Sequence, residues 1–200
     1  SAFKPFVYLA ALEDGISPWD MRDDVAVDIN GYQPQNFGDH YYGTLTLADA
    51  LAHSVNTITV NLAQEVGVKK VVDAAKRVGI TSPLEPNASL ALGTSEVTPL
   101  ELTAAYAAFA NGGLRADPYF ITEVDDAGGK ILYRRAEPRP QRVIDASVDR
   151  DLLAMLWNVV ATGTGGSASL GPREAAGKTG TTQNSQDAWF VGFTTDYVTA

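Results

Sequence analysis

The sequence has no cysteine and only two histidines, His40 and His53. The absence of thiols excludes disulfide bonds, thiol catalysis and thiolate metal ligands together. Two histidines also argue against a histidine-rich metal site, and a structural role is the favoured interpretation of both. We therefore expect no metal and no cofactor.

Long apolar runs and excess positive charge are missing as well. No stretch approaches the roughly 18 uninterrupted apolar residues of a membrane-spanning helix. The first residues also lack the signal-peptide pattern of a basic segment followed by an apolar one. The formal net charge is −9, which argues against a nucleic-acid partner because phosphate binding needs a basic face. An anionic substrate would need a local cationic pocket.

What the sequence does contain is enough apolar residues for one globular domain. Its 200 residues are 45% hydrophobic and 20% charged, a balance that allows a buried core. Apolar spacing and capping residues predict six helices. The expected helices are Phe3–Glu13, Leu47–His53, Thr57–Val66, Lys69–Val78, Pro99–Ala110 and Ser147–Ala161.

Strand patterns concentrate in the second half of the chain. We expect a short strand near Val25–Val27, a hairpin around residues 126–129, and three closely spaced strands at 174–182, 188–194 and from 197 onward. Helices that precede such strands predict an α+β fold, an antiparallel sheet flanked by helices. Because the chain begins at a helix turn and stops inside a strand, we expect a domain spanning residues 1–200 that is truncated at both ends.

Ser1 and Lys4 are the first candidates for chemistry. A spacing of three residues on a helix places the hydroxyl and the amine on one face. A serine hydroxyl needs a base to become a nucleophile, and a desolvated lysine can be neutral enough to serve. Alone, this pair is also what an ordinary helix start with a surface lysine looks like.

Two further patterns carry polar groups. Ser54-Val55-Asn56 lies between two helices, where an extended tripeptide would direct Ser54 and Asn56 to one side and Val55 into the core. Lys178-Thr179-Gly180-Thr181 lies in a predicted strand, where glycine allows another backbone to approach and lysine suits a carboxylate. Each pattern alone is equally compatible with helix caps or a turn.

Together, in the order Ser-x-x-Lys, Ser-x-Asn and Lys-Thr-Gly, the three patterns resemble the motif set of penicillin-binding proteins and class A β-lactamases. The similarity covers most of the chain and is greatest to the transpeptidase domain of bifunctional, class A penicillin-binding proteins. The segments that carry it are SAFKPFVYLAALEDG, TLADALAHSVNT, LALGTSEVTPLELTAAYAAFANGG and AAGKTGTTQNSQDAWFVGFT.

The resemblance implies a role for each motif residue. Ser1 would be the nucleophile acylated by the penultimate D-alanine of a stem peptide or by a β-lactam, with Lys4 as its general base. Ser54 and Asn56 would complete the proton network and bind the substrate amide. The Lys178 strand would bind the substrate carboxylate and, through the N–H groups of Ser1 and Thr181, an oxyanion; the residues implied in this strand are Lys178, Thr179, Gly180, Thr181 and Thr182.

The resemblance also implies a larger parent protein. Members of this family carry strands upstream of the nucleophile, and class A members add a glycosyltransferase domain and a membrane anchor. We therefore expect a bacterial inner-membrane protein whose domain faces the periplasm, with peptidoglycan and possible partners in a cell-wall synthesis complex. The isolated chain is expected to be acylated poorly.

Three alternatives use the same residues differently. An N-terminal-nucleophile amidohydrolase would use the α-amine of Ser1 as base, which leaves Lys4 and Lys178 unexplained. A β-lactamase or D,D-carboxypeptidase would pass the acyl group to water. A β-lactam sensor would be acylated without turnover.

Overall fold

The computed structural model describes residues 1–137, 139–181 and 188–200. The helices are α1 (Lys4–Glu13), α2 (Leu47–Ala52), α3 (Asn56–Val66), α4 (Val68–Val78), α5 (Pro99–Ala110) and α6 (Ala146–Ala161), with short 3-10 turns η1 (Phe37–Asp39), η2 (Ala88–Leu92) and η3 (Gly166–Ala168). All six predicted α-helices are confirmed. Their ends lie within one residue of the predicted bounds, and Thr98 and Glu101 form a reciprocal capping box at α5.

Every strand pairing is antiparallel, which confirms the α+β class. The strands are β1 (Met21–Asp24), β2 (Gly43–Thr46), β3 (Leu114–Arg115), β4 (Glu123–Asp125), β5 (Ile131–Arg134), β6 (Gln141–Arg142), β7 (Ala176–Thr181), β8 (Ala188–Phe193) and β9 (Val198–Thr199). The strand predicted near Val25–Val27 is wrong. Strand β1 pairs with β2, which was not predicted, and the pairing ends at Asp24 opposite Gly43.

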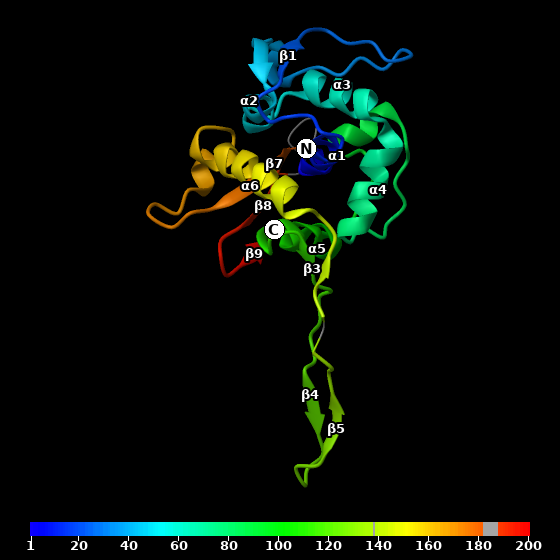
Figure 1. Cartoon of the computed structure of the whole chain (residues 1–200), viewed down its shortest axis with the longest axis vertical. Coiled ribbons are helices and arrows are strands. Elements are labelled where there is room, and N and C mark those ends of the chain that lie inside the picture. Colours follow the sequence, from blue (N-terminus) through cyan, green and yellow to red (C-terminus); the bar gives the residue numbers. More distant parts are fainter. Residues whose placement is uncertain (138, 182–187) are drawn as a thin grey trace.

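Helix α1 is the centre of the molecule (Figure 1). Residues 4–12 of this helix are all buried, as expected for a helix that is apolar on every side and enclosed by other elements. Helices α3, α4 and α6 pack around it. The start of α1 is therefore held in place by its neighbours, and so are the residues just before it.

A three-stranded sheet with the order β7-β8-β9 completes the body. Helix α6 packs against β7, while α5 packs against β8 and β9. Strand β7 is thus an edge strand among the described strands. Its outer edge pairs with no other described strand, although most residues of β7 are buried.

The β4–β5 hairpin projects far from this body as a separate arm (Figure 1). It confirms the hairpin predicted around residues 126–129, and β3 pairs with β6 at its base. Several of its apolar side chains, including Phe120 and Leu132, are exposed. The arm does not contribute to the cleft described next.

Candidate active site

Ser1 and Lys4 lie in the turn that leads into α1. The Lys4 N–H donates to Ser1 O at 3.1 Å, and the helix itself begins at Lys4. Pro5 fits the first turn because a backbone N–H there has no intrahelical partner. The amino group of Ser1 donates to Leu92 O at 2.9 Å, which ties this turn to η2.

Lys4 is a fully buried amine with three oxygen partners. Its side chain is 0% exposed. Its Nζ donates to Ser54 O at 2.5 Å, to Ser54 Oγ at 3.1 Å and to Asn56 Oδ1 at 2.6 Å. The structure therefore brings together three of the residues that the sequence motifs singled out, although Lys4 and Ser54 are 50 residues apart in the chain.

The backbone at Ser54 differs from the extended tripeptide expected from the sequence. Ser54 has φ of +56°, in the left-handed region that side chains other than glycine occupy at a cost. The chain must reverse between the end of α2 at Ala52 and the start of α3 at Asn56, and this single residue makes the reversal. Val55 is buried in the core, as predicted.

Lys178 approaches the same serine from the sheet. Its side chain is 0% exposed, and its Nζ donates to Ser54 Oγ at 2.9 Å and to Thr179 O and Thr179 Oγ1 at 3.1 Å each. Ser54 Oγ thus lies between the amines of Lys4 and Lys178. A hydroxyl has one proton and two lone pairs, so it can accept from one amine while donating to the other.

Burial lowers the pKa of both lysines. Desolvation, followed by the charge of Lys178, holds the pKa of Lys4 well below 10.5. Desolvation also lowers the pKa of Lys178 to about 7. Two charged amines this close to one hydroxyl repel each other, so one of them is expected to be neutral, and a neutral amine has a lone pair with which to accept a proton.

The remaining predicted residues lie along β7. Thr179 and Thr181 line the cleft beside Ser1. A Cβ added at Gly180 would lie 3.2 Å from the Cβ of Ala2, so the absence of a side chain there allows β7 to pack against the turn that carries Ser1. The approach of substrate to Gly180 stays a prediction, and Thr182 lies outside the described residues.

These groups open into a cleft of about 720 Å³. It is lined by Ser1, Gln35, Asn36, Phe37, Gly38, Tyr42, His53, Ser54, Val55, Asn56, Thr164, Thr179 and Thr181. No local pattern in the sequence pointed to the loop around Asn36. Thr164 was also missed, although Thr164 and Thr179 share a hydrogen bond of 2.8 Å between their hydroxyls.

The two histidines pack against one tyrosine at the cleft entrance. The rings of His53 and Tyr42 stack with centroids 5.2 Å apart, and His40 meets Tyr42 edge-on at 4.7 Å. Both histidine–tyrosine contacts are aromatic packing interactions.

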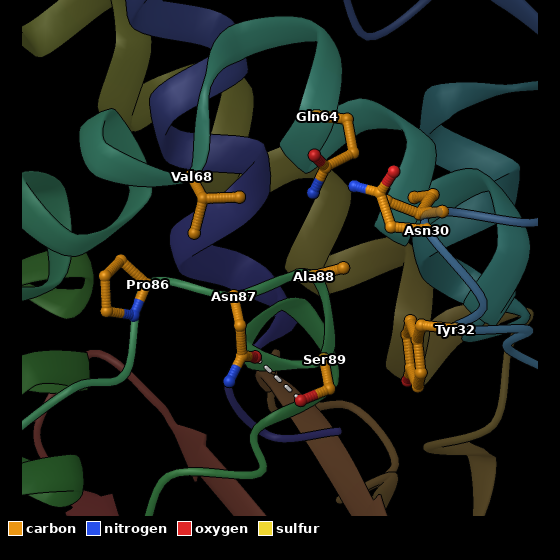
Figure 2. A pocket seen from close by; sticks show the side chains of 9 residues that line it. Asn30, Tyr32, Gln64, Val68, Pro86, Asn87, Ala88 and Ser89 are labelled. Atoms are coloured by element: carbon orange, nitrogen blue, oxygen red, sulfur yellow. Dashed lines mark hydrogen bonds between the residues drawn. The ribbon is translucent and has the colours of Figure 1, made fainter.

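A second cavity, of about 400 Å³, is lined by residues from the 29–32 loop, the α3–α4 junction and η2 (Figure 2). Its polar side chains are neutral; Ser89 Oγ donates to Asn87 Oδ1 at 2.8 Å, for example. None of the motif residues lies in it. The chemistry therefore belongs to the first cleft.

Over the described ranges, no group of three or more histidine, aspartate or glutamate residues is placed to hold a metal ion. In the same residues, no helix has the length and apolar content to cross a bilayer.

The site thus combines a serine at a helix start with two buried lysines that share one hydroxyl, an arrangement compatible with acyl transfer. The chain belongs to the family described as penicillin binding protein transpeptidase domain, which matches residues 1–199. The resemblance noted in the sequence motifs is thereby confirmed.

Curated relatives agree with this membership. The chain is 45% identical to "Penicillin-binding protein 1A" of Aquifex aeolicus over 205 residues, covering 100% of this chain and 28% of that protein. It is 38% identical to "Penicillin-binding protein 1A" of Neisseria lactamica, covering 100% of this chain and 27% of that protein. The chain thus spans less than a third of the length of these relatives.

Solved structures share the fold. Penicillin-binding protein 1A from Haemophilus influenzae superimposes with a TM-score of 0.88 at 29% identity, covering 96% of this chain and 36% of that one. PonA1 from Mycobacterium tuberculosis in complex with penicillin V superimposes with a TM-score of 0.87 at 29% identity, covering 98% of this chain and 57% of that one.

Proposed function

We propose that this chain is the acyl-transferring domain of a serine D,D-transpeptidase that cross-links peptidoglycan stem peptides ending in D-Ala-D-Ala and is acylated by β-lactams. The observation that carries the proposal is the position of Ser54 Oγ, within hydrogen-bond distance of both Lys4 Nζ and Lys178 Nζ beside the cleft that contains Ser1.

These contacts support a route for acylation. Neutral Lys4 accepts the proton of the Ser1 hydroxyl as its oxygen attacks the carbonyl carbon of the penultimate D-alanine. The peptide C–N bond then breaks, and the departing D-alanine nitrogen takes up a proton through the Ser54 hydroxyl, which is replenished from Lys4. Ser1 is left as an ester of the D-alanine carbonyl. The amine of a second stem peptide then attacks this carbonyl and releases the serine hydroxyl, with the proton transfers in the reverse order.

Substrate binding uses the rest of the motifs. The Asn56 side chain accepts from Lys4 and faces the cleft, where its amide suits a substrate peptide group. Charged Lys178 with the Thr179 and Thr181 hydroxyls suits the terminal carboxylate. The exposed edge of β7 suits an extended peptide, which would pair as an additional strand.

The parent protein is proposed to be a class A penicillin-binding protein. It would add a peptidoglycan glycosyltransferase domain and a membrane anchor to this domain, which would face the periplasm. The length of the curated relatives, of which this chain covers 28% in the Aquifex protein, supports additional domains. Such a protein would act within a cell-wall synthesis complex.

The test is mass spectrometry of the full-length protein after exposure to penicillin, followed by peptide mapping. We expect one penicilloyl adduct on Ser1 and none in the Ser1→Ala variant. An adduct at another residue would overturn the assignment. Supplying an acyl-donor peptide with an acceptor amine distinguishes the reactions, because a transpeptidase forms the amide product whereas a hydrolase releases only the free acid.

A further inference from the structure

The start of helix α3 is capped by a residue far away in the sequence. Val55 occupies the N-cap position and has no side-chain oxygen for the first N–H groups of the helix. Asn36 supplies it: its Oδ1 accepts from Asn56 N at 2.8 Å and from Thr57 N at 3.3 Å. A loop residue thus caps the helix N-terminus, a role that a serine or aspartate at the N-cap position usually has.

Asn36 is itself fixed by a buried carboxylate. Its Nδ2 donates to Asp24 Oδ1 at 2.8 Å, to Asp24 Oδ2 at 3.0 Å and to His40 O at 3.0 Å. Asp24, only 1% exposed, also accepts from Tyr42 N at 2.8 Å and from the Thr57 hydroxyl. Every hydrogen-bonding atom of the Asn36 side chain is therefore engaged.

The same loop fixes the side chain of Asn56. Asn56 Nδ2 donates to Gln35 O at 2.6 Å, while its Oδ1 accepts from Lys4 Nζ at 2.6 Å. The backbone of Asn56 is held by Asn36 and its amide is oriented by Gln35, the neighbouring residue. The rotamer that presents an oxygen to Lys4 is thus set by residues 35 and 36.

A buried carboxylate costs desolvation energy, and a satisfied polar network of this kind selects one arrangement of its members. Neither Asp24 nor Asn36 belongs to the three motifs. This pair joins the strand β1, the loop 35–42 and the start of α3.

We propose that Asp24 and Asn36 are positioning residues for acylation, which hold Asn56 and Ser54 in the register that Lys4 requires. This proposal rests on the proposed function, because acylation of Ser1 is its readout. Residues of this kind act through Asn56, so their loss changes the rate of acylation while leaving Ser1, Lys4 and Lys178 in place.

The first test compares rates of acylation of the full-length protein by a fluorescent penicillin. Asn36→Ala is expected to lower the second-order rate constant roughly 10- to 100-fold, since small displacements of an oriented group have effects of this size. The double variant Asn36→Ala with Asn56→Ala is expected to be no slower than Asn56→Ala within about twofold, because both changes remove the same function. Fully multiplicative losses would overturn the proposal.

A control separates positioning from general destabilisation. Val72→Ala truncates a core side chain in α4, away from the cleft, and lowers the melting temperature by cavity formation. At a temperature well below both transitions it is expected to acylate at the wild-type rate. An Asn36→Ala variant that is no slower than Val72→Ala would contradict the proposal.

The Asp24→Asn variant tests the other member of the pair. It turns one carboxylate oxygen into an NH2 group, so the donors of Asn36, Tyr42 and Thr57 can no longer all be satisfied. We expect acylation roughly tenfold slower than in the wild type, and a wild-type rate would count against the pair. If wild-type protein were not acylated at Ser1, the proposed function would fail instead.

Discussion

The two lysines at Ser54 differ in what they can do, although both are buried amines. Desolvation, together with the charge of Lys178, lowers the pKa of Lys4. Desolvation lowers the pKa of Lys178 to about 7. The proposed function assigns the base to Lys4 and the carboxylate-binding cation to Lys178, and each role makes a different prediction.

Replacing Lys4 tests the base. Lys4→Ala is expected to slow acylation roughly 10²- to 10⁴-fold, the range over which general bases contribute. Lys4→Arg is expected to be equally slow, since arginine keeps the charge and cannot be deprotonated. The measurement is fluorescent penicillin labelling of the full-length protein. Wild-type labelling by Lys4→Ala would exclude Lys4 as the base, and the exposed Lys69→Ala variant serves as control.

The pH dependence of acylation tests both lysines together. A base must be deprotonated, so the rate falls as the pH drops below the lowered pKa of Lys4. A carboxylate-binding cation must be protonated, so the rate for an anionic penicillin also falls as the pH rises through about 7, the pKa of Lys178. We expect a bell-shaped profile. Lys178→Arg should remove the alkaline limb, and an unchanged limb would exclude Lys178 as its source.

At the scale of elements, the capping box at α5 also joins that helix to the end of α4. The Glu101 carboxylate accepts from Thr98 N at 3.0 Å, from Thr81 N at 2.7 Å and from Ser82 N at 2.8 Å. The hydroxyl of Thr81, followed by that of Ser82, holds the pKa of Glu101 well below its usual range. One side chain therefore fixes a helix start and a loop.

We expect Glu101→Ala to lower the free energy of unfolding by about 1 to 2 kcal/mol, because three backbone donors lose their partner. Urea denaturation of the full-length protein, followed by a probe in this domain, measures the loss. Acylation well below the transition should stay at the wild-type rate. A variant as stable as the wild type would show that water replaces the carboxylate fully.

The elements that were predictable are those whose signals are local. The Thr98–Glu101 box and the Gly-rich hairpin turn each act within a few residues, so their helix and hairpin were expected correctly. Strand β2 was missed because it depends on a partner distant in the chain, and the conformation of Ser54 was missed because a left-handed residue after a helix is usually glycine. Asp24 and Asn36 were missed because they act on residues 20 to 33 positions away. No local sequence pattern indicates contacts of that range.

At the scale of the whole molecule, the buried lysines make stability depend on pH. Folding leaves Lys4 and Lys178 with pKa values below 10.5, so the unfolded chain binds more protons between about pH 7 and 10.5. The free energy of unfolding therefore rises with pH across this window. Burial raises the pKa of Tyr8 and Tyr106 above 10.0, so the unfolded state loses protons first above that pH and stability falls again.

We expect the melting temperature of the domain to be highest near pH 10. Calorimetry of the full-length protein at constant, high ionic strength measures it, since salt screens the general repulsion of an acidic chain. Lys178→Met should flatten the rise between about pH 7 and 10, because the group responsible is gone. A melting temperature that falls steadily from pH 7 would contradict the assignment.

The left-handed backbone at Ser54 has a consequence for how this protein tolerates change. At φ of +56°, glycine avoids a steric cost of about 1 kcal/mol that any other side chain carries. Ser54→Gly would remove this cost, but it would also take away the oxygen that two buried amines contact, a loss of similar or larger size. A library screened for heat tolerance alone is therefore not expected to enrich Ser54→Gly, and stability and chemistry both favour serine at this position.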